Sequence, residues 1–157
     1  MATRKPLVLG DDGRPQQLQS SDTLGITSET GQASQTAAAT LIAGNVVYSS
    51  AANTVNKAKA DASGTVFAIG LATAAINSAA SGIVQFNGIV TLTTAQWDAA
   101  FGTTGGLTFN TTYYLSAATA GLGTTTVTTT AGQYVLILGK AISTTEFDLD
   151  IREPILL

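Results

Sequence analysis

From Gly44 onward, short β-type segments alternate with glycine-containing turns, and this pattern limits the fold more than any other feature. The strands that we expect span residues 45–49, 65–72, 82–93, 113–116, 124–128, 134–142 and 146–151. Apolar and acidic residues alternate in the last of these segments, as in an antiparallel strand with one buried face. Gly88 interrupts the third segment, which indicates either a bulge or a close approach of another backbone segment. The pattern predicts an all-β fold, a small antiparallel β-barrel or sandwich.

One short helix is expected within this β region. Thr93 is followed three residues later by Gln96, which is the spacing of a capping box at a helix start. Trp97 and Phe101 then share one helical face, and Gly102 is placed to end the helix. The alternative is a surface loop that holds a core tryptophan. In either case we expect Trp97 to be a packing residue.

Charge is concentrated near the two ends of the chain. Between residues 62 and 139 the only charged residue is Asp98. A soluble monomer usually displays charges of both signs over its whole surface. Two explanations remain open for this stretch: other subunits cover part of it, or its Thr and Ser side chains form a neutral solvated face.

The first 40 residues have little periodicity and are rich in Gln, Ser, Thr and Gly. Such a segment cannot by itself bury enough apolar surface to offset the entropy lost on ordering. We therefore expect an extended N-terminal arm, residues 1–40, in contact with partner subunits, and a β domain, residues 41–157. The alternative is an arm that folds back onto its own domain. The expected contact residues of the arm are Arg4, Lys5, Leu7, Val8, Leu9, Arg14 and Leu18.

The composition excludes several classes of chemistry. The chain has no cysteine and no histidine, so it has no disulfide framework, no thiolate zinc site and no Ser-His-Asp triad. A net charge of -3 argues against a nucleic-acid partner. The longest apolar stretch, residues 66–76, is shorter than the ~20 residues of a membrane span. The start of the chain lacks the apolar region of a signal peptide, so we expect neither membrane association nor export.

Carboxylates and tyrosines are the remaining candidates for chemistry. Asp61 and Asp98 could act as acid and base, but a glycosidase needs a convergent pair in an aromatic-lined cleft. The adjacent Tyr113 and Tyr114 could stack on a sugar, although a period of two places one of them in the core. A row of acidic residues could bind calcium, but neighbours two apart in a strand are about 7 Å apart, and a solvated edge is more common. This row comprises Glu146, Asp148 and Asp150. We expect no enzyme activity, metal, cofactor or small-molecule substrate.

Two stretches resemble structural proteins of tailed-phage virions. The opening MATRKPLVLGDDGRPQQLQSSDTL is similar to the N-terminal segments of such proteins. TLTTAQWDAAFGTTGGLTFNTTYYLSAATAGLGTTT and GQYVLILGKAISTTEFDLDIREPILL resemble the small β domain of capsid decoration and fibre proteins. The matching positions are residues 92–97, 106–107, 113–116, 139–141 and 154–156, with Gly121 and Gly132. The chain departs from this pattern at Phe109-Asn110, where such proteins often have Pro-Gly.

The resemblance implies a capsid decoration (cement) protein that binds the outer surface of the major capsid shell and stabilises it, as a homotrimer. The major capsid protein would be its partner, and its location would be the exterior of the virion after synthesis in the host cytoplasm. The expected subunit-packing residues are Trp97, Phe101, Tyr113 and Tyr114. The alternative is a short head- or tail-fibre subunit that recognises a host glycan, with Tyr48 or Tyr113 as its contact. A depolymerase that uses Asp61 or Asp98 is a third possibility.

Overall fold

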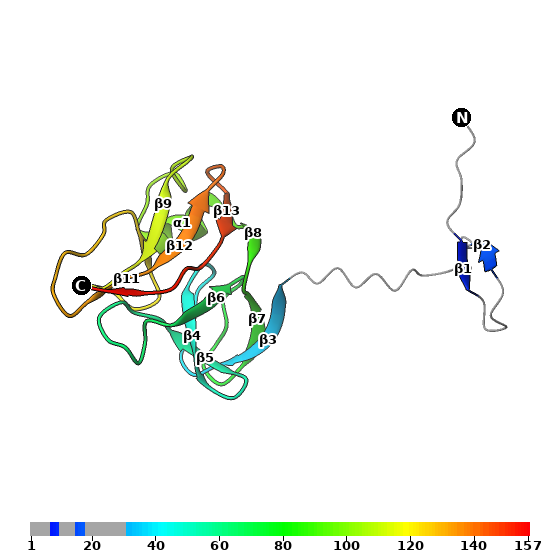
Figure 1. The fold of residues 1–157 in the computed structure, drawn as a ribbon, viewed down its shortest axis with the longest axis horizontal. Helices are drawn as coiled ribbons and strands as arrows, with labels where there is room; N and C mark the ends of the chain where they lie inside the picture. Colours follow the sequence, from blue (N-terminus) through cyan, green and yellow to red (C-terminus); the bar gives the residue numbers. More distant parts are fainter. Residues whose placement is uncertain (1–6, 10–14, 18–30) are drawn as a thin grey trace.

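The computed structural model describes residues 7–9, 15–17 and 31–157, and this part of the chain is built from β-strands with one short helix (Figure 1). In chain order the elements are β1 (Leu7–Leu9), β2 (Pro15–Gln17), β3 (Gln32–Ala37), β4 (Val46–Ala51), β5 (Thr54–Lys57), β6 (Ala68–Ala72), β7 (Ser81–Gln85), β8 (Gly88–Thr91), α1 (Thr94–Phe101), β9 (Thr112–Leu115), β10 (Gly123–Thr124), β11 (Tyr134–Val135), β12 (Ile137–Ala141), β13 (Glu146–Leu149) and β14 (Ile155–Leu156). The expected all-β barrel class with one short helix is confirmed.

Strands β3 to β7 form a closed barrel in the order β3-β5-β4-β6-β7. All pairs are antiparallel except β3–β5, which is parallel. Residues 32–37, which we had assigned to the arm, therefore belong to the barrel, and the expected boundary at residue 40 is corrected. Because most side chains of β3 are polar, its sequence shows no apolar alternation that would predict a strand. These side chains are accommodated by polar partners on β7, as where Gln32 Nε2 donates to Gln85 Oε1 at 3.0 Å.

The second layer is a five-stranded antiparallel sheet in the order β10-β9-β12-β13-β8, with α1 packed against it. The helix has the expected capping box: Gln96 N donates to Thr93 Oγ1 at 3.2 Å, and Thr93 N donates to Gln96 Oε1 at 2.9 Å. Gly102 ends the helix with a φ of 65°, in the left-handed region that suits glycine. The signals read from the sequence therefore place this helix correctly.

Two hydrophobic clusters lie on opposite faces of β4 and β6. Val46 on β4 packs into the larger cluster, between the barrel, the sheet and α1, whereas its neighbour Val47 packs into the barrel interior. Leu71 and Ala72 on β6 divide in the same way. Successive side chains of a strand point to opposite faces, so a strand with a core on each side must be apolar on both. This requirement explains the consecutive apolar pairs Val46-Val47 in β4 and Leu71-Ala72 in β6.

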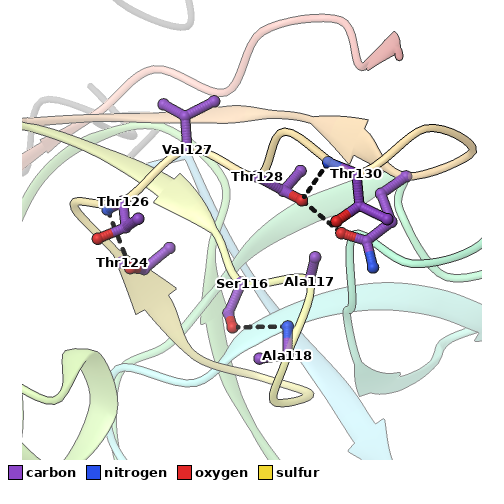
Figure 2. Close-up of a pocket in the computed structure, with 9 residues that line it drawn as sticks. Ser116, Ala117, Ala118, Thr124, Thr126, Val127, Thr128 and Thr130 are labelled. Carbon is purple, nitrogen blue, oxygen red and sulfur yellow. Dashed lines mark hydrogen bonds between the residues drawn. The ribbon is translucent and has the colours of Figure 1, made fainter.

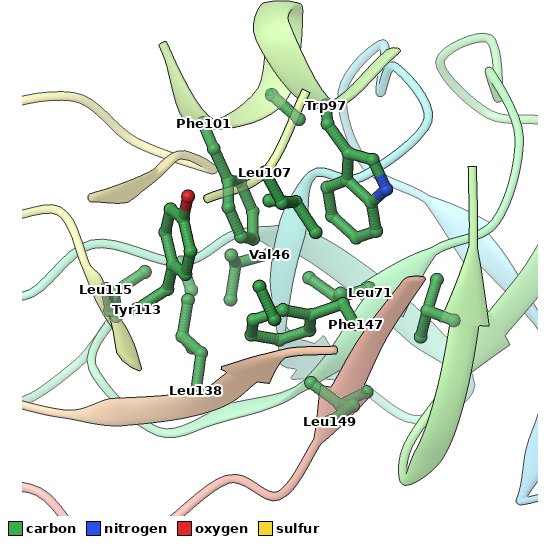
Figure 3. Packing of buried hydrophobic residues seen from close by; sticks show 14 of the residues in the cluster. Val46, Leu71, Trp97, Phe101, Leu107, Tyr113, Leu115, Leu138, Phe147 and Leu149 are labelled. Carbon is green, nitrogen blue, oxygen red and sulfur yellow. The ribbon is translucent and has the colours of Figure 1, made fainter. Parts of the chain in front are cut away.

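An aromatic group fills the larger cluster (Figure 3). The ring centroids of Trp97 and Phe101 on α1 are 4.9 Å apart, and Phe147 on β13 lies 5.7 Å from Trp97 and 5.6 Å from Phe101. Both buried polar atoms have partners: Trp97 Nε1 donates to Thr145 O at 2.9 Å, and the Tyr113 hydroxyl accepts from Thr108 N at 3.0 Å. The helix is thereby fixed against the sheet.

Several strand boundaries differ from the sequence-based prediction. Residues 82–93 form two strands instead of one, because the chain turns at Gly88 (φ 79°) and passes from the barrel into the sheet. Residues 134–142 are likewise divided between β11 and β12. Only Thr124 of the 124–128 segment is in a strand, because the hydroxyls of Thr124 and Thr128 accept from the backbone amides of Thr126 and Thr130 and form turns. Strands β1, β2, β3, β5 and β14 were not predicted.

Candidate interaction surface

The expected contact residues of the arm fall largely outside the described part of the chain. Arg4, Lys5, Arg14 and Leu18 lie outside it. The apolar triplet Leu7–Leu9 forms β1, which pairs antiparallel with β2. The expectation that this segment contacts a partner stays a prediction.

Three of the four expected subunit-packing residues lie inside the chain's own core. Trp97 and Tyr113 are 0% exposed and Phe101 is 5% exposed. These side chains fill the space between α1 and the sheet, so they have no surface to offer another subunit, and that expectation is corrected for all three. Tyr114 is half-buried and keeps an accessible part. The alternation predicted for the tyrosine pair is confirmed, and it removes Tyr113 as a glycan contact, while Tyr48 is half-buried against the larger cluster.

The carboxylate of Asp98 organises the turn that follows α1. It accepts hydrogen bonds from Gly106 N at 2.8 Å, Thr103 Oγ1 at 2.8 Å and Gly105 N at 3.0 Å. These donors, with the Gly106 amide first, favour the charged form and lower the pKa of Asp98. The hydrogen bonds of this carboxylate therefore stabilise its own turn, and its lowered pKa is the opposite of what a group that donates a proton at neutral pH needs.

The other acidic candidates are separate surface groups. Lys59 Nζ lies 2.6 Å from Asp61 Oδ2, and its hydrogen bond lowers the pKa of Asp61. Asp150 forms an ion pair with Arg152, while Asp148 is exposed on the outer face of the sheet, with Lys140 opposite it on β12. Within the described residues, no three acidic side chains are grouped as metal ligands would be.

A Thr-rich cavity of about 370 Å³ lies beside β10 and the 124–133 loop (Figure 2). Its hydroxyl groups hold the loops themselves: Ser116 Oγ accepts from Ala118 N at 3.2 Å, and Thr124 Oγ1 accepts from Thr126 N at 3.1 Å. Thr128 Oγ1 donates to the Gln133 side chain. No aromatic side chain lines this cavity, so it lacks the stacking surface that sugar recognition commonly uses.

The most distinctive surface is apolar and lies where the chain leaves the sheet. A groove of about 360 Å³ lies between the barrel and the C-terminal segment, and Figure 1 shows this segment passing from β13 to the side of β11. We call this groove together with β14 and Leu157 the C-terminal apolar surface. Its apolar members are Phe67, Ile69, Phe86, Leu136, Ile151, Pro154, Ile155, Leu156 and Leu157. Strand alternation in the sequence does not predict this surface, although the run of apolar residues after Pro154 is a usable signal.

Exposure on this surface is high for large apolar residues. Phe67 is 57% exposed, Ile155 62%, Leu156 59% and Leu157 44%. Scattered apolar residues on a protein surface need no explanation, but a contiguous group of this kind marks an interaction site. No helix in the described ranges is long and apolar enough to cross a membrane.

Comparison with known proteins gives no relative for this chain. No protein-family model matches it, no curated protein matches it, and no solved structure matches it.

Proposed function

We propose that this chain is a virion structural protein, a capsid decoration protein that binds the outer surface of a major capsid shell as a homotrimer and stabilises it. The observation that carries the proposal is the C-terminal apolar surface on a closed, charge-poor β fold. A fold whose own core is complete gains nothing from leaving Phe67 and Leu156 in water, so these side chains indicate association.

The state of the candidate catalytic groups supports a binding role. Asp98 is engaged by the backbone of its own turn, and Asp61 by Lys59. An acid–base pair needs two titratable groups that converge on one substrate and differ in pKa. Both of these carboxylates instead have a lowered pKa and structural partners.

Stabilisation by such a protein is a consequence of mass action. A ligand that binds only the assembled shell shifts the equilibrium between shell and free subunits toward the shell. Three copies joined in one trimer add avidity, because the second and third contacts become intramolecular. In this proposal the β domains associate with one another, and the segment around Leu7–Leu9 reaches the neighbouring capsid subunits.

The test uses shells assembled from the major capsid protein encoded in the same phage genome. The full chain should co-sediment with these shells to saturation and raise the temperature at which they disassemble. A variant that lacks residues 1–24 should keep a folded β domain, because the barrel and sheet are formed by residues 32–157, but should not bind. Shells that neither bind the full chain nor change their disassembly temperature would refute the proposal.

A fibre subunit that binds a host glycan is the second candidate, and the partly accessible Tyr48 and Tyr114 are the observation that favours it. Electron microscopy of the virion separates the two functions. Copies at three-fold or quasi-three-fold positions of the shell support decoration, whereas a few copies at the tail or the vertices support a fibre.

A further inference from the structure

The ribbon formed by β11 and β14 presents an open strand edge next to the apolar groove. β14 pairs with β11 alone among the described strands. Leu157 N donates to Gln133 O at 2.9 Å, and Tyr134 N points away from β14, since it donates to Ala60 O at 2.9 Å. Hydrogen-bonded and non-hydrogen-bonded pairs alternate in an antiparallel ladder. The N–H and C=O of Leu156, which pairs with Tyr134, are therefore directed toward the open edge.

The side chains of β14, like its open backbone edge, are exposed and lack a covering partner among the described residues. Ile155 and Leu156 are neighbours on the strand and point to opposite faces, yet both are about 60% exposed. A two-stranded ribbon has little stability of its own in water. An apolar edge strand that is exposed on both faces is also a liability in a soluble protein unless another chain covers it.

The charges around the surface indicate which partner covers it. The Asp150–Arg152 ion pair lies where the C-terminal segment enters the groove, and the Lys59–Asp61 ion pair lies on either side of Ala60, which accepts from the β11 backbone. Each pair combines one cation with one anion. Glu153 also lines the groove, so two cations and three anions surround the apolar centre, and this surface is close to neutral. A nearly neutral surface of this kind can meet another copy of itself, and it does not select a strongly acidic or basic partner.

We infer that the C-terminal apolar surface is where copies of this chain associate with each other, with the β14 edge and the Phe67 groove both covered in the oligomer. A stable association buries more than about 1,000 Å² in total. The three-residue apolar end of the chain is too small for this by itself, so the groove must take part. The number of copies, three, rests on the proposed function, whereas the location of the contact does not.

The experiment measures the mass of the full-length chain by light scattering over a concentration series. The test variants are Leu156→Asp and Phe67→Asp, which place a charge at the two ends of the surface without entering either core. The matched control is Phe109→Asp, because Phe109 is 70% exposed but lies in the loop before β9, outside this surface. Circular dichroism and the fluorescence of the buried Trp97 verify the fold of each variant.

We expect an oligomer for the wild type and the control, and self-association weakened roughly tenfold to a hundredfold by each test variant. A wild type that is monomeric at every concentration would overturn the inference. So would a test variant that keeps the full mass, or a control that dissociates equally. We expect a fourth variant, Val8→Asp, to keep the wild-type mass. An oligomer that dissociates with this variant but withstands both Leu156→Asp and Phe67→Asp would place the contact at Leu7–Leu9 and would also overturn the inference.

Binding to capsid shells, measured in parallel, distinguishes this inference from the proposed function. A monomeric chain that still co-sediments with shells contradicts the inference and leaves the decoration role in place. An oligomer that dissociates with Leu156→Asp but never binds shells supports the inference and contradicts the decoration role.

Discussion

Replacing Val46 or Val47 by alanine tests whether β4 separates two packed cores. Both side chains are 0% exposed, but Val46 belongs to the cluster between barrel and sheet, and Val47 to the barrel interior. Each substitution removes two buried methyl groups, which are worth about 0.8 kcal/mol apiece, and leaves a small cavity. We therefore expect each variant to lose about 2 kcal/mol of unfolding free energy.

The double variant provides the sharper result. The two side chains belong to different clusters, so the double variant should lose about 4 kcal/mol, and any departure from this sum measures coupling through their shared backbone. A loss of that size leaves a domain of typical stability, about 5–15 kcal/mol, marginally folded. Val127→Ala is the matched control, because Val127 is 39% exposed and its truncation should change the unfolding free energy by less than about 0.5 kcal/mol.

The assay is equilibrium unfolding in urea, followed by the fluorescence of Trp97, which is fully buried in the larger cluster. Circular dichroism should give the same midpoint if the barrel and sheet unfold together. If either Val46→Ala or Val47→Ala loses no more unfolding free energy than the control, one side of β4 lacks a packed core, and the division of β4 between two cores is wrong.

Three further substitutions have defined outcomes. Thr93→Ala removes the hydroxyl that accepts from Gln96 N and should cost about 1 kcal/mol in urea unfolding. Asp98→Asn should lower the thermal midpoint at neutral pH. This deficit should disappear as the pH falls from 3.8, the ordinary carboxyl pKa, through the lowered pKa of folded Asp98, because the wild-type carboxylate then becomes protonated. A deficit that stays unchanged at low pH would contradict its electrostatic origin. Gly139→Ala should cost about 1–3 kcal/mol, because φ is 150° and a Cβ would lie 2.0 Å from Asp148 O, and a wild-type midpoint would show that the strand adapts.

Local signals in the sequence predicted the local structure well. The Thr93 capping box and Gly102 define α1, and the alternation in residues 146–151 correctly places Phe147 and Leu149 in the core. Each of these features depends on residues within one turn or one strand. The sequence alone is sufficient there because the deciding hydrogen bonds and side-chain directions are local.

Features that depend on distant partners were missed. β3 is polar and is a strand only because β7 and β5 lie on its two sides. The division at Gly88 follows from the two adjoining segments joining different sheets. The C-terminal apolar surface was missed for a related reason: whether Leu156 is buried depends on which strands surround it, and alternation along the chain does not determine that.

We propose that this chain attaches to the outside of a capsid shell. A cryo-electron microscopy reconstruction of the virion, or of shells mixed with the full chain, tests it most directly. We expect density for the barrel and sheet in groups of three on the outer surface at three-fold or quasi-three-fold positions, with the β11–β14 ribbons facing one another within each group. A shell surface without this density at saturating protein would contradict the decoration role, whereas single copies on the shell with β14 directed into solvent would contradict the contact between copies.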